Sequence, residues 1–151
     1  MRFFVLFTFA LCCFACGETV PPPPAMPPLS DLPLVPLPFE MANTDGYFYS
    51  DGTGEWDLGA AAGAGEYLKA KGVSPLALST VIDPSLNLPE GSYLLLITPE
   101  EITISAGDKA GIFNGTTTLE QVIAFAPDSE RGLFLPTGTI TDMPRYAYRG
   151  Y

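Results

Sequence analysis

The residue types in this sequence restrict the chemistry that the chain can perform. Histidine is absent from all 151 residues, which excludes Ser-His-Asp and Cys-His catalysis within them. The three cysteines (Cys12, Cys13 and Cys16) lie within the first 16 residues, so the rest of the chain can form neither a disulfide framework nor a thiolate metal site. Chemistry beyond residue 16 would depend on carboxylates, Tyr, Ser or Lys. We expect no cofactor and no metal.

Glu100 and Glu101 are adjacent carboxylates, and such a pair invites interpretation as an acid and a base. They lie in the stretch TPEE, between two runs that read as strands. Adjacent residues of a turn point apart and stay solvated. We therefore expect these two side chains to be surface residues of a turn.

The strands that flank this turn are predicted from the alternation of apolar residues. Tyr93, Leu95 and Ile97 share one face of the first strand, and Ile102 and Ile104 share one face of the second. The turn between them makes the pair an antiparallel hairpin.

A helix is predicted for residues 106–126, after this hairpin. Asp108 can cap its N-terminus, and apolar residues then recur at near-helical spacing. Gly111 and Gly115 lie four residues apart on one face, which would let the helix pack closely on the sheet.

Two weaker elements complete the predicted domain. Residues 60–72 form an Ala-rich helix that Gly72 ends, and Leu133 and Leu135 form a short strand that Pro136 breaks. The predicted fold class is α+β: an antiparallel sheet with two helices packed on one face.

The N-terminus predicts export. Residues 1–16 consist of Met1, the basic Arg2 and an apolar run that is too short to span a bilayer but has the length and order of a signal peptide. Cys16 follows the small Ala15, as the lipidated cysteine of a bacterial lipoprotein does. A lipoprotein signal and an ordinary leader both remain open. The expected location is the bacterial periplasm, outer membrane or cell surface.

Residues 17–35 are rich in proline, which favours extended geometry, and we expect them to form a linker between the leader and a domain that begins at residue 36. The formal net charge is −10, with 17 acidic and 7 basic residues. Because nucleic-acid surfaces need clustered Lys and Arg, this balance argues against a nucleic-acid partner.

Three stretches within residues 90–151, taken in order, carry a resemblance to a known family. They are EGSYLLLITPEEITISA, AGIFNGTTTLEQVI and LPTGTITDMPRYAYRGY. They resemble the N-terminal accessory domain of family 20 glycoside hydrolases, the β-N-acetylhexosaminidases, and the start of the barrel that follows it. The chain departs from the family pattern at Asn114, where an aromatic residue is common, and at Thr117, where Gln is usual.

The resemblance implies a domain order. Residues 36–140 correspond to the accessory domain, and residues 141–151 to the first residues of a (β/α)₈ catalytic barrel. Because such a barrel needs about 200 residues or more, the resemblance implies that the barrel is truncated. It also implies that the parent protein is an exported β-N-acetylhexosaminidase.

The resemblance further implies a substrate-assisted mechanism, in which the acetamido oxygen of the substrate attacks the anomeric carbon. The Asp-Glu pair of that mechanism belongs to a motif H-x-G-G-D-E, which this sequence lacks. No catalytic residue is therefore expected in this chain, and the chain alone is predicted to be inactive. Arg149 matches the family arginine that binds the sugar hydroxyls, and Asp142 and Arg145 are expected to organise the junction between the domains.

The implied partner is a glycan that ends in N-acetylglucosamine or N-acetylgalactosamine, with a lipid anchor at Cys16 if the lipoprotein alternative holds. Two other interpretations remain open. One is a free-standing exported α+β module that binds a glycan or packs against a partner chain. The other is an accessory domain of a different glycosidase family, such as family 84, although the run D-x-P-R ahead of Y-R-G favours family 20.

Overall fold

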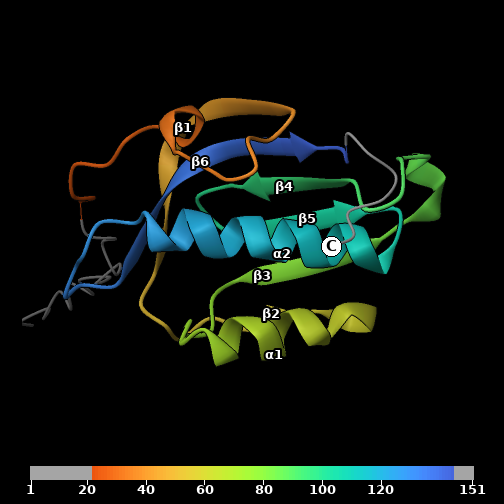
Figure 1. Cartoon of the computed structure of the whole chain (residues 1–151). Coiled ribbons are helices and arrows are strands. Elements are labelled where there is room, and N and C mark those ends of the chain that lie inside the picture. Colours follow the sequence, from red (N-terminus) through yellow and green to blue (C-terminus); the bar gives the residue numbers. More distant parts are fainter. Residues whose placement is uncertain (1–21, 145–151) are drawn as a thin grey trace, which may run out of the picture.

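The computed structural model describes residues 22–144, which form one sheet with two helices on one of its faces (Figure 1). The strands are β1 (Glu40–Ser50), β2 (Trp56–Asp57), β3 (Leu78–Ile82), β4 (Tyr93–Ile97), β5 (Ile102–Ala106) and β6 (Leu133–Asp142). The helices are α1 (Gly63–Ala70) and α2 (Lys109–Ala124), and the short 3-10 turns are η1 (Leu29–Asp31), η2 (Gly59–Ala61) and η3 (Pro84–Leu86). The predicted α+β class with two helices is confirmed. Within residues 22–144, no helix has the length and apolar character needed to cross a membrane.

The sheet is mixed, which corrects the prediction of an antiparallel sheet. Its strand order is β1-β6-β4-β5-β3-β2. The pairs β1–β6, β6–β4 and β4–β5 are antiparallel, whereas β3–β5 and β2–β3 are parallel. β4 and β5 form the predicted antiparallel hairpin. The other neighbour of β5 is β3, which runs parallel to it. The order in which strands meet depends on long-range pairing, which alternation within one strand does not reveal.

Each helix is the crossover between two parallel strands of this sheet. α1 links β2 to β3, and α2 links β5 to β6, which both run antiparallel to β4 between them. Both crossovers move in the same direction along the sheet, between strands that point the same way. Because such connections are right-handed, both helices fall on the same face.

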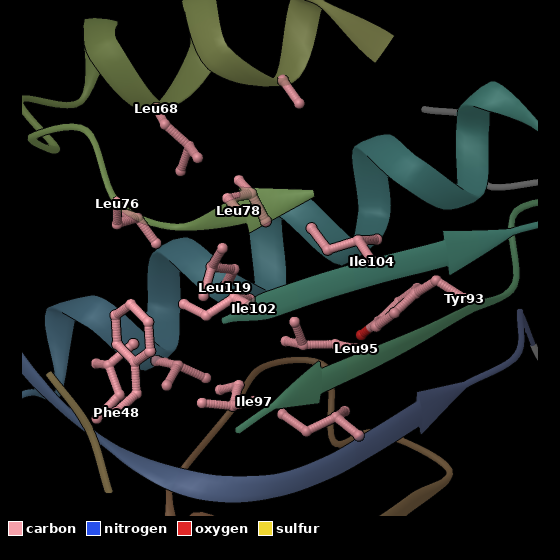
Figure 2. Packing of buried hydrophobic residues seen from close by; sticks show 14 of the residues in the cluster. Phe48, Leu68, Leu76, Leu78, Tyr93, Leu95, Ile97, Ile102, Ile104 and Leu119 are labelled. Carbon is pink, nitrogen blue, oxygen red and sulfur yellow. The ribbon is translucent and has the colours of Figure 1, made fainter. Parts of the chain in front are cut away.

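The main core lies between this face and the helices (Figure 2). Tyr93, Leu95, Ile97, Ile102 and Ile104 are each no more than 2% exposed, so the face predicted from the alternation is the buried one. The residues between them on β4 and β5 point to the other face of the sheet and remain partly or fully exposed.

α2 packs closely on the hairpin, as its sequence predicts. The carboxylate of Asp108 accepts a hydrogen bond from the backbone N–H of Gly111 at 2.7 Å, and so caps the helix. A Cβ added to Gly111 would collide with the backbone carbonyl oxygen of Ser92, and one added to Gly115 would lie 2.7 Å from Cγ2 of Ile104. The predicted packing role of both glycines is confirmed.

α1 is shorter than the helix predicted for residues 60–72, because its first part is the 3-10 turn η2. Leu68 of α1 is fully buried in the core. Gly72 has φ +78°, a left-handed conformation that ends the helix as predicted.

Part of the proline-rich segment, before the predicted domain boundary at residue 36, already packs on the domain. Leu29, Leu32 and Leu34 are 0, 4 and 3% exposed and belong to the core. Proline prevents a residue from joining a ladder, but it does not prevent the leucines beside it from being buried. We call residues 29–39 the N-terminal strap, because they lie against the sheet and α2 before β1 begins.

β6 is longer than the short strand that Pro136 was expected to break. Residues 133–136 pair with β1 alone, and pairing with β4 begins only at Gly138. The proline therefore lies where the strand has one partner, opposite an irregularity in β1, and a sheet tolerates proline at such a position. β6 continues to Asp142, two residues past the predicted domain boundary at 140.

Candidate functional site

The residues that the sequence singled out lie in different parts of the chain. Cys16, Arg145 and Arg149 fall outside the described residues. Glu100 and Glu101 lie in the turn between β4 and β5, where both side chains are exposed. Their backbone N–H groups donate to the hydroxyl of Thr98 at 3.3 and 3.1 Å, so the turn is built by Thr98. The expectation that these carboxylates are solvated turn residues is confirmed.

Two hydrogen bonds join Gly91, just before β4, to the N-terminal part of α2 and its cap. The second oxygen of the Asp108 carboxylate accepts from the backbone N–H of Gly91 at 3.0 Å, and the side-chain amide of Asn114 donates to the Gly91 carbonyl at 2.8 Å. Pro144 packs on Gly91, where a Cβ would lie 3.3 Å from its Cγ. We call Gly91, Asp108, Asn114 and Pro144 the exit junction. Pro144, the last described residue, lies at this junction.

Asp142 joins the start of β1 to the end of β6 next to this junction. Its carboxylate accepts a hydrogen bond from the backbone N–H of Phe39 at 3.2 Å, and Glu40 pairs with Thr141 in the ladder. The sequence predicted a junction role for Asp142, together with Arg145. The structure places Asp142 at the edge where the N-terminal strap meets the end of the domain.

A second polar group joins the two helices. The hydroxyl of Tyr67 on α1 donates to the Glu120 carboxylate on α2 at 2.6 Å, and the Lys71 ammonium lies 3.2 Å from the other carboxylate oxygen. The Tyr67 ring also contacts the ring of Phe113, with 5.6 Å between the centroids. The hydrogen bond from Tyr67 is the main cause that lowers the pKa of Glu120, and the hydrogen bond to Glu120 raises the pKa of Lys71.

Four of the described carboxylates have a pKa below the ordinary value. A glycosidic general acid needs a raised pKa, so that it still carries its proton near neutral pH. Hydrogen bonds instead lower the pKa of Asp51, Asp83, Asp108 and Glu120, chiefly from Thr53, Ser85, Gly111 and Tyr67 respectively. Donors that stabilise the ionised form act in this direction. These four groups are therefore held as anions and serve as caps and links.

The described surface has open depressions between its elements. A depression of about 290 Å³ lies between the loop that follows α1 and the start of β6. Its lining residues include Asp51, Lys71 and Ile123. Another of about 280 Å³, lined by Ala64, Ile112 and others, lies between the two helices. Within residues 22–144, no three His, Cys, Asp or Glu side chains come together to hold a metal ion. The polar groups of the described residues that are named above form caps, turns and links between elements.

The comparisons with known proteins agree with this description. The family model "Glycosyl hydrolase family 20, domain 2" matches residues 49–143, which is more than half of the chain. A curated "Putative beta-hexosaminidase" of Margaritifera margaritifera is 29% identical over 79 residues, which cover 52% of this chain and 6% of that protein.

Solved structures show the same fold. The β-N-acetylhexosaminidase of Bacteroides fragilis is 27% identical with a TM-score of 0.62, over 74% of this chain and 25% of that one. The family 20 exo-β-N-acetylglucosaminidase of Vibrio harveyi, solved with N-acetylglucosamine, is 26% identical with a TM-score of 0.68, over 84% and 21%. The Streptomyces plicatus N-acetyl-β-hexosaminidase has a TM-score of 0.70 at 23% identity, over 84% and 29%, which shows the fold alone.

This chain therefore spans less than a third of the length of these relatives, and the part it shares with them is the mixed sheet with its two crossover helices. The predicted resemblance to family 20 is confirmed, and the family model extends it toward the N-terminus, to residue 49. The start of a barrel at residues 141–151 stays a prediction. The chain belongs to glycosyl hydrolase family 20 and contains the second domain of that family.

Proposed function

We propose that this chain is the N-terminal part of an exported β-N-acetylhexosaminidase, which removes terminal N-acetylhexosamine residues from glycans. The observation that carries the proposal is the match of residues 49–143 to domain 2 of family 20, in a chain that spans 21–29% of three solved relatives. In this proposal the described domain is a support for a catalytic barrel and takes no part in bond cleavage.

The electrostatics of the domain support this division of labour. The described carboxylates with shifted pKa values are all held as anions by hydrogen bonds, so none of these four is prepared to donate a proton to a leaving group. Asp108, Asn114 and Asp142 instead form hydrogen bonds close to the last described residues of the domain.

In the proposed enzyme, hydrolysis is substrate-assisted, and its acid and its orienting carboxylate belong to the barrel. Arg149 would hold hydroxyls of the terminal sugar, because its guanidinium presents several donors in a fixed plane. Residues 1–16 would direct export, and lipidation of Cys16 would anchor the protein at the bacterial cell surface or in the periplasm.

The proposal is tested by capturing the native protein from its source cells with an antibody against residues 36–140. The captured protein should hydrolyse a chromogenic N-acetyl-β-glucosaminide, whereas recombinant residues 17–151 should not. Hydrolysis by the recombinant chain would overturn the support role. A captured protein that lacks all hydrolytic activity would favour the alternative, a free-standing binding or structural module.

A further inference from the structure

The N-terminal strap exposes an unusual concentration of apolar surface. Val35, Leu37 and Phe39 are 75, 62 and 61% exposed, and they are three of the eight large hydrophobic residues exposed in the described chain. Residues 32–39, LPLVPLPF, contain no polar or charged side chain. Exposed apolar residues that are scattered singly need no explanation, but three within five positions indicate an interaction surface. We call Val35, Leu37 and Phe39 the strap ridge.

The ridge is held in place by contacts on both sides of it. The side-chain amide of Gln121 on α2 accepts from the backbone N–H of Val35 at 2.9 Å and donates to its carbonyl at 3.0 Å. The adjacent Leu32 and Leu34 are buried in the core, and the backbone N–H of Phe39 donates to Asp142. A segment that only separated a leader from a domain would need none of these contacts. The strap is therefore a preorganised surface.

The position of the ridge identifies what can reach it. Phe39 is hydrogen-bonded to Asp142, and the chain passes Pro144 only two residues later. Two residues of extended chain span about 7 Å at most, so Pro144, the last described residue, lies close to the Phe39 end of the ridge. A domain tethered this closely is present at an effective concentration of about a millimolar, far above that of a free partner.

We propose that the strap ridge is the seat on which the domain that follows residue 144 docks. This inference rests on the proposed function, because it requires a longer polypeptide. It assigns the proline-rich segment a part in the interdomain interface and identifies the matching surface as apolar. The two hydrogen bonds between the Gln121 side chain and the backbone of Val35 hold the ridge against α2.

The test compares the reactivity of single cysteines with a maleimide in the longer native polypeptide and in residues 17–151, read by mass spectrometry of the labelled peptide. Leu37→Cys reports on the ridge. Val81→Cys is the matched control, because Val81 is 45% exposed on the face of the sheet opposite the helices. We expect Leu37→Cys to react about tenfold more slowly in the longer protein, because a tethered domain covers the site most of the time, and Val81→Cys to react equally in both.

Each other outcome overturns the inference. Equal reactivity of Leu37→Cys in both proteins would show that the following domain leaves the ridge free, while the proposed function would stand. Protection in residues 17–151 that grows with protein concentration would show that a second copy covers the ridge. A source protein that ends at residue 151 would overturn the docking and the proposed function together.

Discussion

The two helices share one face of the sheet, but they are held there by different means. α2 has 16 residues and is capped by Asp108, and both of its glycines lie so close to the hairpin that a Cβ would collide. α1 has 8 residues and no side-chain cap, and open space surrounds its first glycine, Gly63. A Cβ on its second glycine, Gly65, would collide with the side chains of Leu58 and Trp56, whereas a Cβ on Gly111 of α2 would meet backbone. α2 is also the helix that contacts the strap through Gln121 and the exit junction through Asn114.

The domain is therefore organised around α2. The helix connects the hairpin, the strap and the point where the chain leaves, whereas α1 is added to its side through Leu68 and the Tyr67–Glu120–Lys71 group. Changes on α2 should therefore cost more stability than matching changes on α1.

The largest difference is expected between Gly111→Ala and Gly63→Ala. The new methyl group at residue 111 would meet the backbone of Ser92, which cannot move unless β4 moves with it, so we expect a loss of about 3 kcal/mol in the free energy of unfolding. Gly63→Ala has room and gains helix propensity, so it should leave stability unchanged or raise it by about 0.5 kcal/mol. Urea unfolding of residues 17–151 measures both. Equal values for the two variants would contradict the account of α2.

The cap of α2 should have the next largest effect. Asp108→Ala removes the acceptor for the N–H groups of Gly111 and Gly91, and a loss of about 1–2 kcal/mol is expected. Asp108→Asn is the control, because its single amide oxygen keeps only one of these bonds, so its loss should be smaller. If both variants unfolded at the same denaturant concentration as the unchanged chain, the hydrogen bonds of Asp108 would contribute nothing to the free energy of unfolding.

The same carboxylate predicts a dependence on pH. Hydrogen bonds from Gly111 and Gly91 lower the pKa of Asp108 below the ordinary value of 3.8. Its contribution to stability is therefore fully present above that value and is lost as the pH falls through the lower folded pKa. The melting temperatures of the unchanged chain and of Asp108→Asn should differ most at neutral pH and converge well below pH 4. A gap that widened on acidification would reverse the predicted sign.

The link between the helices should contribute less. Tyr67→Phe removes one hydrogen bond, and Glu120→Gln removes the charge that attracts Lys71, at a partly exposed site where such pairs are worth about 0–1 kcal/mol. We expect each variant to lose less than about 1 kcal/mol, and the effect of Glu120→Gln to shrink in high salt. If either variant lost as much free energy of unfolding as Gly111→Ala, the contact between the helices would matter as much as the packing of α2 on the hairpin, which would contradict this ranking.

The smallest global effect is expected for Gln121→Ala. The lost amide bonds hold an exposed segment, so global stability should fall by about 0.5–1 kcal/mol. Hydrogen exchange should show the change where unfolding does not, because the backbone N–H of Val35 loses its acceptor and should exchange faster. The N–H of Ile104 in the central hairpin serves as the internal control and should keep its rate.

The parts of the fold that the sequence predicted are those whose signals are local. The alternation of Tyr93, Leu95 and Ile97, the cap at Asp108 and the glycines of α2 are all read within a few residues, and the structure confirms them. The parallel pairing of β3 with β5 depends on where distant segments meet. Residues 17–35 are predicted to be a linker because prolines dominate their composition, although Leu29, Leu32 and Leu34 are buried in the core.

The candidate site divides in the same way. The solvated turn at Glu100 and Glu101 could be predicted from a short motif. The interdomain role of Asp142 with Arg145 stays a prediction, although Asp142 accepts a hydrogen bond from Phe39. Asn114 and Gln121 were missed as contact residues, because their partners Gly91 and Val35 lie 23 and 86 positions away. The role of Arg149 stays a prediction, since this residue lies outside the described part of the chain.

The central claim, that this domain supports a separate catalytic barrel on the same polypeptide, is tested most directly by the mass of the native protein. An antibody against residues 36–140 would identify that protein in its source cells. The account predicts a mass above the 16.1 kDa of this chain by at least the roughly 200 residues that a barrel requires. A protein of 16.1 kDa or slightly less would contradict it.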